Sequence, residues 1–240
     1  MPEAFEASEA ERGGLVEVRF TLAVSGETVP GRLWLPGGAS GPVPLVLIQH
    51  PGMSSKDDPI VAEPARAWAA AHGWACLGLD APGHGERASA DPLSALRDPE
   101  AAGALATQFA AEVSAVLDEI TARYPLATTG LGYYGYSLGA MLGVPAVASD
   151  GRFRAAVFAA VGTGALSGPA EGAGSHLAAL GDVAVRVIAK AQDELISGEA
   201  TAALFAGLPG EKDLVTLPGG HFAVGPEVAG AAEEWLAAHL

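Results

Sequence analysis

Cysteine is almost absent from this sequence, because Cys76 is the only one among 240 residues. A single cysteine cannot form an internal disulfide, so packing and hydrogen bonds must stabilise the fold. Cys76 lies in the apolar run Trp74–Leu79, and this position predicts a thiol packed inside a buried strand. The alternative, a reactive thiol, is disfavoured because reactive cysteines are partly exposed.

Positive charge is scarce as well. The sequence has 13 Lys and Arg residues against 28 Asp and Glu residues, which gives a formal net charge of −15. The averaged field of such a chain repels polyanions. We therefore expect neither nucleic acid nor an anionic membrane as a partner.

Long hydrophobic runs are also missing. The longest apolar stretches, around residues 140–148 and 155–161, are too short to cross a bilayer. The first eleven residues contain no basic residue and no apolar core, so they predict no secretory signal. We expect a cytoplasmic protein whose residues 1–14 form an acidic, partly frayed arm.

The sequence is nonetheless rich in apolar residues, which make up 50% of it, and this content predicts a compact fold with buried strands. Alternating residues predict an antiparallel pair of strands at 16–22 and 29–35. From residue 43 onward, short apolar runs alternate with alanine-rich segments of helical period, which is typical of parallel βα units. Further strands are predicted at 43–49, 74–80, 130–136, 155–160, 183–189 and 213–217, and helices at 60–72, 99–123, 138–149, 198–206 and 226–239. The whole pattern predicts an α/β fold in a single domain, with an eight-stranded, mostly parallel sheet and helices on both faces.

The segment Gly135-Tyr-Ser-Leu-Gly139 stands between a strand-like and a helix-like run. A serine on a sharp turn from strand to helix needs small residues two positions before and after it, because the backbones approach too closely there for a Cβ atom. The pattern therefore predicts Ser137 as a nucleophile. Glycine and serine are also common in ordinary loops, but the flanking strand and helix favour the nucleophile.

A serine hydroxyl becomes a good nucleophile only when a base removes its proton, so the motif demands a histidine and a carboxylate behind it. His221 lies in the glycine-rich loop Leu217-Pro-Gly-Gly-His-Phe222, between the last predicted strand and the last predicted helix. Among the six histidines it alone has this context. We predict His221 as the general base.

The carboxylate is expected after the strand at 183–189, where Asp193 and Glu194 are adjacent. Successive residues of an extended loop point in opposite directions, so only one of the two is expected to face the histidine. We predict Asp193, because Leu195 and Ile196 then supply an apolar anchor beyond the acid. Glu194 remains the alternative acid, and a surface Asp-Glu pair that caps the next helix is the alternative without a catalytic role.

A tetrahedral intermediate needs backbone N–H donors for its oxyanion. The amide of Leu138 follows the serine directly, at the start of a predicted helix. A second donor is expected from the turn His50-Pro-Gly-Met-Ser54, and because its proline lacks an N–H, that donor is Gly52 or Met53. His50 is interpreted as a turn residue rather than a base.

With these residues, the sequence from about Leu15 to Leu240 resembles the α/β-hydrolase superfamily of serine hydrolases. The turn Asp80-Ala-Pro-Gly-His-Gly-Glu86 is similar to a turn that often follows the fourth strand in that superfamily. The resemblance implies a structural role for it, so Asp80 and His84 are given no catalytic part.

The run His50–Asp58 resembles members near the dienelactone hydrolase and prolyl-oligopeptidase-like branches. Two residues depart from these patterns. His50-Pro51 stands where many relatives have His-Gly, and the nucleophile is serine instead of the cysteine typical of dienelactone hydrolases. The second departure argues against dienelactone as a substrate.

The resemblance implies a hydrolase that cleaves a small carboxylic ester through an acyl-enzyme intermediate. A thioesterase or a small-peptide or amide hydrolase is the alternative, because the same triad serves all of these reactions. A non-catalytic binding protein is disfavoured by the intact order of serine, acid and histidine, and a dehalogenase or epoxide hydrolase would have aspartate in place of Ser137. Without a dinucleotide fingerprint, phosphate loop or metal-spaced His/Cys cluster in the sequence, we expect neither a cofactor nor a metal.

Residues 163–180 lie where this superfamily commonly inserts a lid, and they are too few for a cap of several helices. They and residues 85–97 contain few large apolar side chains. We therefore expect a short lid-like insertion and a shallow, open pocket that favours acetyl to butyryl esters. A small-molecule ester is the expected partner, and a homodimer remains open.

Overall fold

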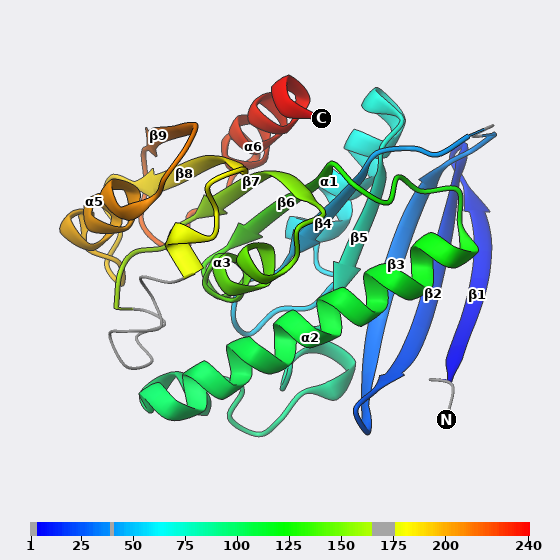
Figure 1. Cartoon of the computed structure of the whole chain (residues 1–240), viewed down its shortest axis with the longest axis horizontal. Coiled ribbons are helices and arrows are strands. Elements are labelled where there is room, and N and C mark those ends of the chain that lie inside the picture. Colours follow the sequence, from blue (N-terminus) through cyan, green and yellow to red (C-terminus); the bar gives the residue numbers. More distant parts are fainter. Residues whose placement is uncertain (1–3, 39–40, 165–175) are drawn as a thin grey trace.

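The computed structural model of the chain describes residues 4–38, 41–164 and 176–240. Its centre is a nine-stranded sheet with the order β1-β2-β3-β5-β4-β6-β7-β8-β9 (Figure 1). The strands are β1 (Phe5–Arg12), β2 (Leu15–Val24), β3 (Glu27–Pro36), β4 (Leu45–Gln49), β5 (Ala75–Leu79), β6 (Leu131–Tyr136), β7 (Phe153–Ala159), β8 (Ala184–Lys190) and β9 (Lys212–Leu217). In the order of the sheet, neighbouring strands from β1 to β5 are antiparallel. Neighbouring strands from β5 to β9 are parallel. The predicted α/β fold with a mostly parallel sheet is confirmed, although the strands number nine instead of eight.

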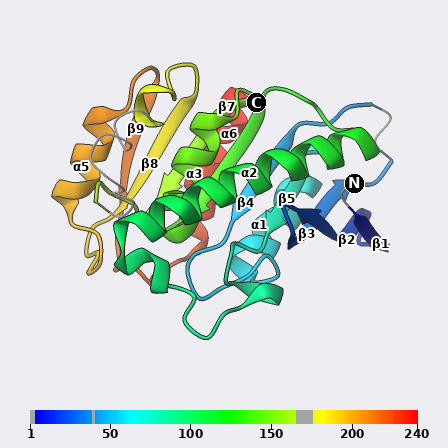
Figure 2. The same cartoon turned by 60° about the horizontal axis from the view of Figure 1, so that its bottom comes forward.

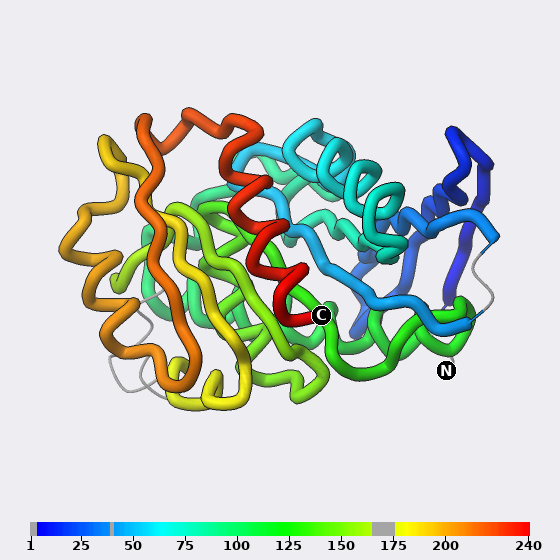
Figure 3. Tube along the Cα trace, turned by 90° about the horizontal axis from the view of Figure 1, so that it is seen from above, coloured from blue at the N-terminus to red at the C-terminus, as the bar shows by residue number. Residues whose placement is uncertain are grey.

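Helices cover both faces of the sheet, as predicted. They include α1 (Pro59–His72), α2 (Pro99–Arg123), α3 (Leu138–Ser149), α5 (Gly198–Gly207) and α6 (Pro226–His239). Helices α2 and α3 lie on one face (Figure 2), and α1 and α6 lie on the other (Figure 3). The buried side chains form two clusters accordingly, one containing Phe109 and Leu142 and the other containing Trp68 and Trp235.

The central strands are buried along their whole length because helices cover both faces. Every residue of β4, β5 and β6 is buried, which explains why these strands are continuous apolar runs without alternation. Cys76 lies in β5 with no exposed surface, and burial raises the pKa of its thiol. The prediction that Cys76 packs inside a buried strand is confirmed.

Of the expected frayed arm at residues 1–14, the described residues 4–14 are ordered instead. Residues 5–12 form β1, which a turn at Gly13 and Gly14 joins to β2, and β1 pairs with β2 along its whole length. Both glycines have positive φ, 59° and 81°, as a tight hairpin turn requires. The error arose because β1 is exposed and acidic, so its pairing rests on backbone hydrogen bonds and leaves no hydrophobic alternation to detect.

The two stretches without predicted strands or helices differ in outcome. Residues 85–97 hold two short 3-10 helices, Gly85–Arg87 and Ser94–Arg97, separated by a turn. In the lid-like insertion at 163–180, residues 165–175 lie outside the described residues.

Candidate active site

Ser137 stands at the sharp turn between β6 and α3. Its φ of 52° and ψ of −113° are a conformation that L-residues rarely adopt. A Cβ atom on Gly135 would lie 2.4 Å from the Gly139 carbonyl oxygen, and one on Gly139 would lie 2.4 Å from the Gln49 carbonyl oxygen. The steric reason given for small residues on both sides of the serine therefore applies in this fold.

His221 reaches the serine from the loop that follows β9. Its Nε2 lies 2.8 Å from the Ser137 Oγ, and the residue is only 4% exposed. The loop turns at Gly219, whose φ of 97° favours glycine. The serine and histidine, 84 residues apart in the chain, thus make one hydrogen bond at the carboxyl ends of the strands.

Asp193 lies behind the histidine, in the loop that follows β8. Its two carboxylate oxygens are 2.9 and 3.0 Å from the His221 Nδ1. Burial alone would raise the pKa of Asp193, but hydrogen bonds from the Ile196 and Leu195 amides and from His221 outweigh it, so the pKa is lowered. An ionised carboxylate is therefore available to orient the imidazole and to stabilise its protonated form.

Glu194 also contacts the histidine, although the sequence argument expected only one of the two acids to face it. Its Oε2 accepts a hydrogen bond of 2.8 Å from the backbone N–H of His221. The alternation argument fails because the loop is not extended: the Asp193 amide turns back to the Lys190 carbonyl oxygen at 3.2 Å. The ring therefore contacts Asp193, and the main chain contacts Glu194.

The predicted oxyanion donors lie on two neighbouring segments. Leu138 is the first residue of α3, so its N–H has no acceptor within the helix. A Cβ atom on Gly52 would lie 3.9 Å from the Leu138 Cβ, which brings the turn after β4 beside the start of α3. Met53 has a φ of 63°, a rare conformation for a residue with a side chain.

Near the site the sequence argument missed Phe222, and it named Met53 only for its backbone N–H. Phe222 is 76% exposed and its ring lies 5.3 Å from the ring of His221, between centroids. Met53 is 74% exposed. Large apolar residues inside glycine-rich loops were the signal that could have identified them.

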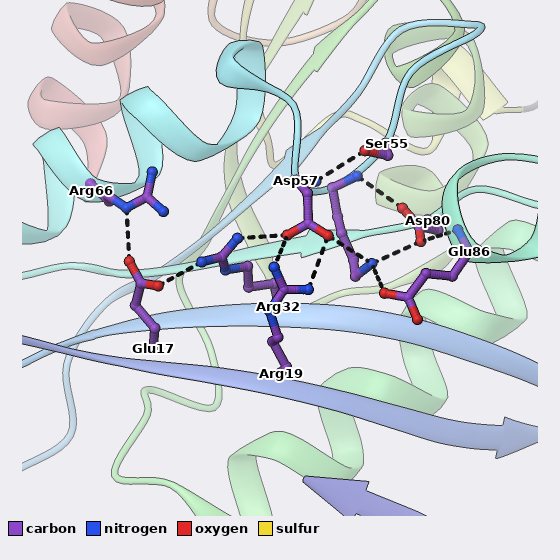
Figure 4. A network of polar contacts seen from close by, with 9 residues as sticks. Glu17, Arg19, Arg32, Ser55, Asp57, Arg66, Asp80 and Glu86 are labelled. Atoms are coloured by element: carbon purple, nitrogen blue, oxygen red, sulfur yellow. Dashed lines mark hydrogen bonds and ion pairs between the residues drawn. The ribbon is translucent and has the colours of Figure 1, made fainter. Parts of the chain in front are cut away.

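A buried ionic network holds the segment after the Gly52 turn (Figure 4). Lys56 is 1% exposed and donates from Nζ to Asp80 at 2.9 Å and to Glu86 at 2.5 Å. Asp80 is fully buried and also accepts from the backbone amides of Lys56 and Glu86, both at 2.9 Å. Burial would lower the pKa of Lys56, but its bonds to Glu86 and Asp80 raise it. Asp80 thus joins the two turns, in agreement with the structural role that the resemblance implied.

His50 is fixed as a neutral side chain under the same turn. Its Nδ1 donates to the Pro51 carbonyl oxygen at 2.7 Å, and its Nε2 accepts from the Ala81 N–H at 3.0 Å. Protonation would place an N–H opposite the Ala81 N–H and charge a fully buried ring. Burial is the main cause that lowers the pKa of His50 to about 4. The interpretation of His50 as a turn residue agrees with these contacts.

We expect His50 to make the fold acid-sensitive. Between pH 6.5 and 4 the unfolded chain binds a proton at this residue and the folded chain does not, so the free energy of unfolding falls as the pH falls. The loss from this residue amounts to about 3 kcal/mol and is complete near pH 4. Urea unfolding at pH 7 to 4 should show a shallower decline for His50→Gln than for the wild type. Parallel curves for the two proteins would contradict the expectation.

A nine-stranded, mostly parallel sheet, a serine at the turn after β6 and a histidine after the last strand define the class as α/β hydrolase. No model of a known protein family matches the sequence, and a comparison with curated proteins found no match. Solved structures do match. A cold-adapted esterase from an Arctic intertidal metagenomic library is 28% identical, with 99% of each chain covered and a TM-score of 0.85.

Two more distant structures share the fold. The acetyl xylan esterase from Paenibacillus sp. R4 is 16% identical over 100% of this chain and 90% of its own, with a TM-score of 0.73. Est1E from Butyrivibrio proteoclasticus is 15% identical over 92% of this chain and 98% of its own, with a TM-score of 0.70. The chain is an esterase-like member of the α/β-hydrolase superfamily, in the carboxylic-ester hydrolase class of enzymes.

Two further features concern cofactors and membranes. Within residues 4–38, 41–164 and 176–240, no group of three or more His, Cys, Asp or Glu side chains is arranged to hold a metal ion. None of the helices in those ranges combines the length and hydropathy that a membrane span requires.

Proposed function

We propose that the protein hydrolyses a small carboxylic ester through an acyl-enzyme intermediate, with Ser137 as nucleophile, His221 as general base and Asp193 as the orienting carboxylate. The observation that carries the proposal is the continuous hydrogen-bond chain from the Ser137 Oγ through both ring nitrogens of His221 to Asp193. A base 2.8 Å from the hydroxyl is within reach of its proton.

Each half-reaction moves one proton through His221. As Ser137 Oγ attacks the ester carbonyl, its proton passes to Nε2 and the oxyanion is stabilised by the amides of Leu138 and of Gly52 or Met53. The imidazolium then protonates the leaving alcohol, and the acyl group stays on the serine. Water attacks the acyl-enzyme with His221 as base, which releases the acid and restores the serine.

The limited space beside the turn at Gly52 supports an ester of modest size. The Leu93 side chain fills the space beside Gly52. Phe222, Leu195 and Met53 are exposed apolar groups close in the chain to His221, Asp193 and Gly52, respectively. The same triad would act on thioesters or small amides, which therefore remain the alternative substrates. The deciding experiment is hydrolysis of p-nitrophenyl esters of increasing acyl length, with thioesters and aminoacyl amides measured alongside.

We expect Leu93 to limit the acyl chain. Its Cδ2 lies 2.9 Å from the place where a Cβ on Gly52 would stand, so it fills the space next to the turn at Gly52, where the ester carbonyl is proposed to bind. The wild-type kcat/KM should be highest for acetyl to butyryl esters. In Leu93→Ala the optimum should move to longer chains, with a gain of up to about 0.8 kcal/mol, roughly fourfold, for each methylene that becomes buried.

The matched control is Leu214→Ala, which shortens a partly exposed leucine of the edge strand β9. It should leave the acyl-length profile unchanged. A wild-type kcat/KM that continues to rise beyond octanoyl esters would contradict the short acyl pocket.

A further inference from the structure

All four hydrogen-bonding groups of His221 are engaged, and the proposed reaction uses only the two on the ring. Nε2 contacts Ser137, and Nδ1 contacts Asp193. The backbone N–H donates to the Glu194 Oε2 at 2.8 Å, and the backbone carbonyl oxygen accepts from the Tyr136 hydroxyl at 2.7 Å. The two main-chain contacts therefore need a separate explanation.

The loop that carries His221 is bound to the loop after β8 at Gly219, whose N–H donates to the Gln192 Oε1 at 2.7 Å and whose carbonyl oxygen accepts from the Gln192 N–H at 3.1 Å. At His221 itself, the main-chain contacts are those with Glu194 and Tyr136. The loop follows β9, the edge strand of the sheet, and contains two glycines directly before the histidine. Glycine gives a loop more backbone freedom than any other residue. A shift of about 1 Å in a catalytic group can lower a rate by up to about 100-fold, so a base on this loop requires an anchor.

The contacts come from two pairs of consecutive residues. Tyr136 and Ser137 are consecutive residues at the turn from β6 to α3, and Asp193 and Glu194 belong to the loop after β8. In each pair one residue contacts the ring and the other contacts the main chain of the same histidine. The ring and the backbone of His221 are thereby fixed by the same two segments.

Glu194 is suited to the main-chain contact. An ionised carboxylate makes a stronger hydrogen bond to a backbone N–H than a neutral acceptor does. A Cβ on Gly220 would lie 2.5 Å from the Glu194 Oε2, so the carboxylate lies directly against the residue before the histidine. On the other side, burial first and the nearby carboxylates second raise the pKa of Tyr136, which keeps its hydroxyl protonated as a donor.

We propose that Glu194 is a positioning residue: its carboxylate holds the backbone of His221 so that Nε2 stays in line with the Ser137 hydroxyl. The inference rests on the proposed function, because it assigns Glu194 a part in the same site. It also separates two adjacent acids by task, with Asp193 acting on the ring and Glu194 on the main chain.

The test compares Glu194→Ala with Glu194→Gln, using p-nitrophenyl acetate as the substrate. Alanine removes the acceptor, so kcat should fall by about 10- to 100-fold while KM stays within about twofold. The glutamine side-chain oxygen can accept the same N–H, so Glu194→Gln should retain kcat within a few-fold. The matched control is Glu199→Ala, which removes an exposed carboxylate in the first turn of α5 and should change neither parameter.

A second readout does not depend on turnover. The proton on His221 Nδ1, shared with Asp193, should give a far-downfield proton NMR signal in the wild type and in Glu194→Gln. In Glu194→Ala this signal should shift and broaden, while circular dichroism shows a folded protein. A merely structural role for this exposed side chain would not move the signal.

The outcomes distinguish the positioning role from the proposed function. An unchanged kcat and an unchanged NMR signal in Glu194→Ala overturn the positioning role, and so does equal damage from alanine and glutamine, because glutamine keeps an acceptor for the His221 N–H. Failure of the proposed function would appear elsewhere, as ester hydrolysis that survives Ser137→Ala and a Ser137 that no fluorophosphonate labels. In that case the NMR comparison still decides whether Glu194 positions His221.

Discussion

Ser137→Ala and His221→Ala should each lower the kcat/KM for p-nitrophenyl acetate by about three or more orders of magnitude. The Ser137 Oγ lies 2.8 Å from the His221 Nε2, so nucleophile and base act as a unit, and the loss of either removes the same step. Asp193→Asn should be impaired to a similar degree. Its amide cannot hold the Nδ1–H tautomer and cannot stabilise the imidazolium.

Two controls match these changes. Ser149→Ala removes an exposed serine hydroxyl from the far end of α3, and His239→Ala removes a histidine from the end of α6. Both variants should keep wild-type kcat/KM. Near-normal turnover in Ser137→Ala or His221→Ala would mean that these residues have been given the wrong roles.

Lys56→Met should lower the free energy of unfolding by about 3 to 5 kcal/mol, since it leaves Asp80 as an unpaired buried charge. Asp80 is fully buried and Lys56 is 1% exposed, so neither solvent nor salt can replace the lost partner. Methionine fills a similar volume, which separates the loss of charge from the loss of packing. Urea unfolding at pH 7 measures the effect.

Two variants define the cause of that loss. Lys56→Met/Asp80→Asn removes both charges and should be less destabilised than Lys56→Met alone, because no uncompensated carboxylate remains. Arg97→Met breaks the exposed pair with Asp91, whose side chains are 69% and 49% exposed, and should leave the unfolding midpoint unchanged. If Lys56→Met behaves like Arg97→Met, the ionic network does not stabilise the turn.

The ionic network of Lys56 and Asp80 lies close to the candidate active site, so a change that destabilises the network is also expected to affect the site. Lys56 and Asp80 hold the segments that follow β4 and β5, and Gly52 lies four residues before Lys56. His50, under the same turn, is neutral because its two ring nitrogens already have partners. Acid or the loss of Lys56 is therefore expected to loosen the turn at Gly52 before the sheet unfolds.

Most of the sheet could be predicted from local pattern. Apolar runs predicted β4 to β8, and such runs occur because helices cover both faces of these strands. The alternation at 16–22 predicted β2, whose side chains are partly buried and partly exposed. Strand β1 could not be predicted in this way. It is held by backbone pairing and the turn at Gly13, and its exposed side chains carry no hydrophobic signal.

The sequence by itself determined which residues could meet at the site. The spacing of Gly135 and Gly139 around Ser137 predicted a sharp turn at the serine, and the order of the loops then limited the candidates for the base and the acid. Only the tertiary structure decided how they meet: both Asp193 and Glu194 contact His221, because the loop after β8 turns instead of extending. The tertiary structure also decided the state of His50: its neutral ring depends on burial and on the Ala81 N–H, 31 residues away in the chain, which no local pattern encodes.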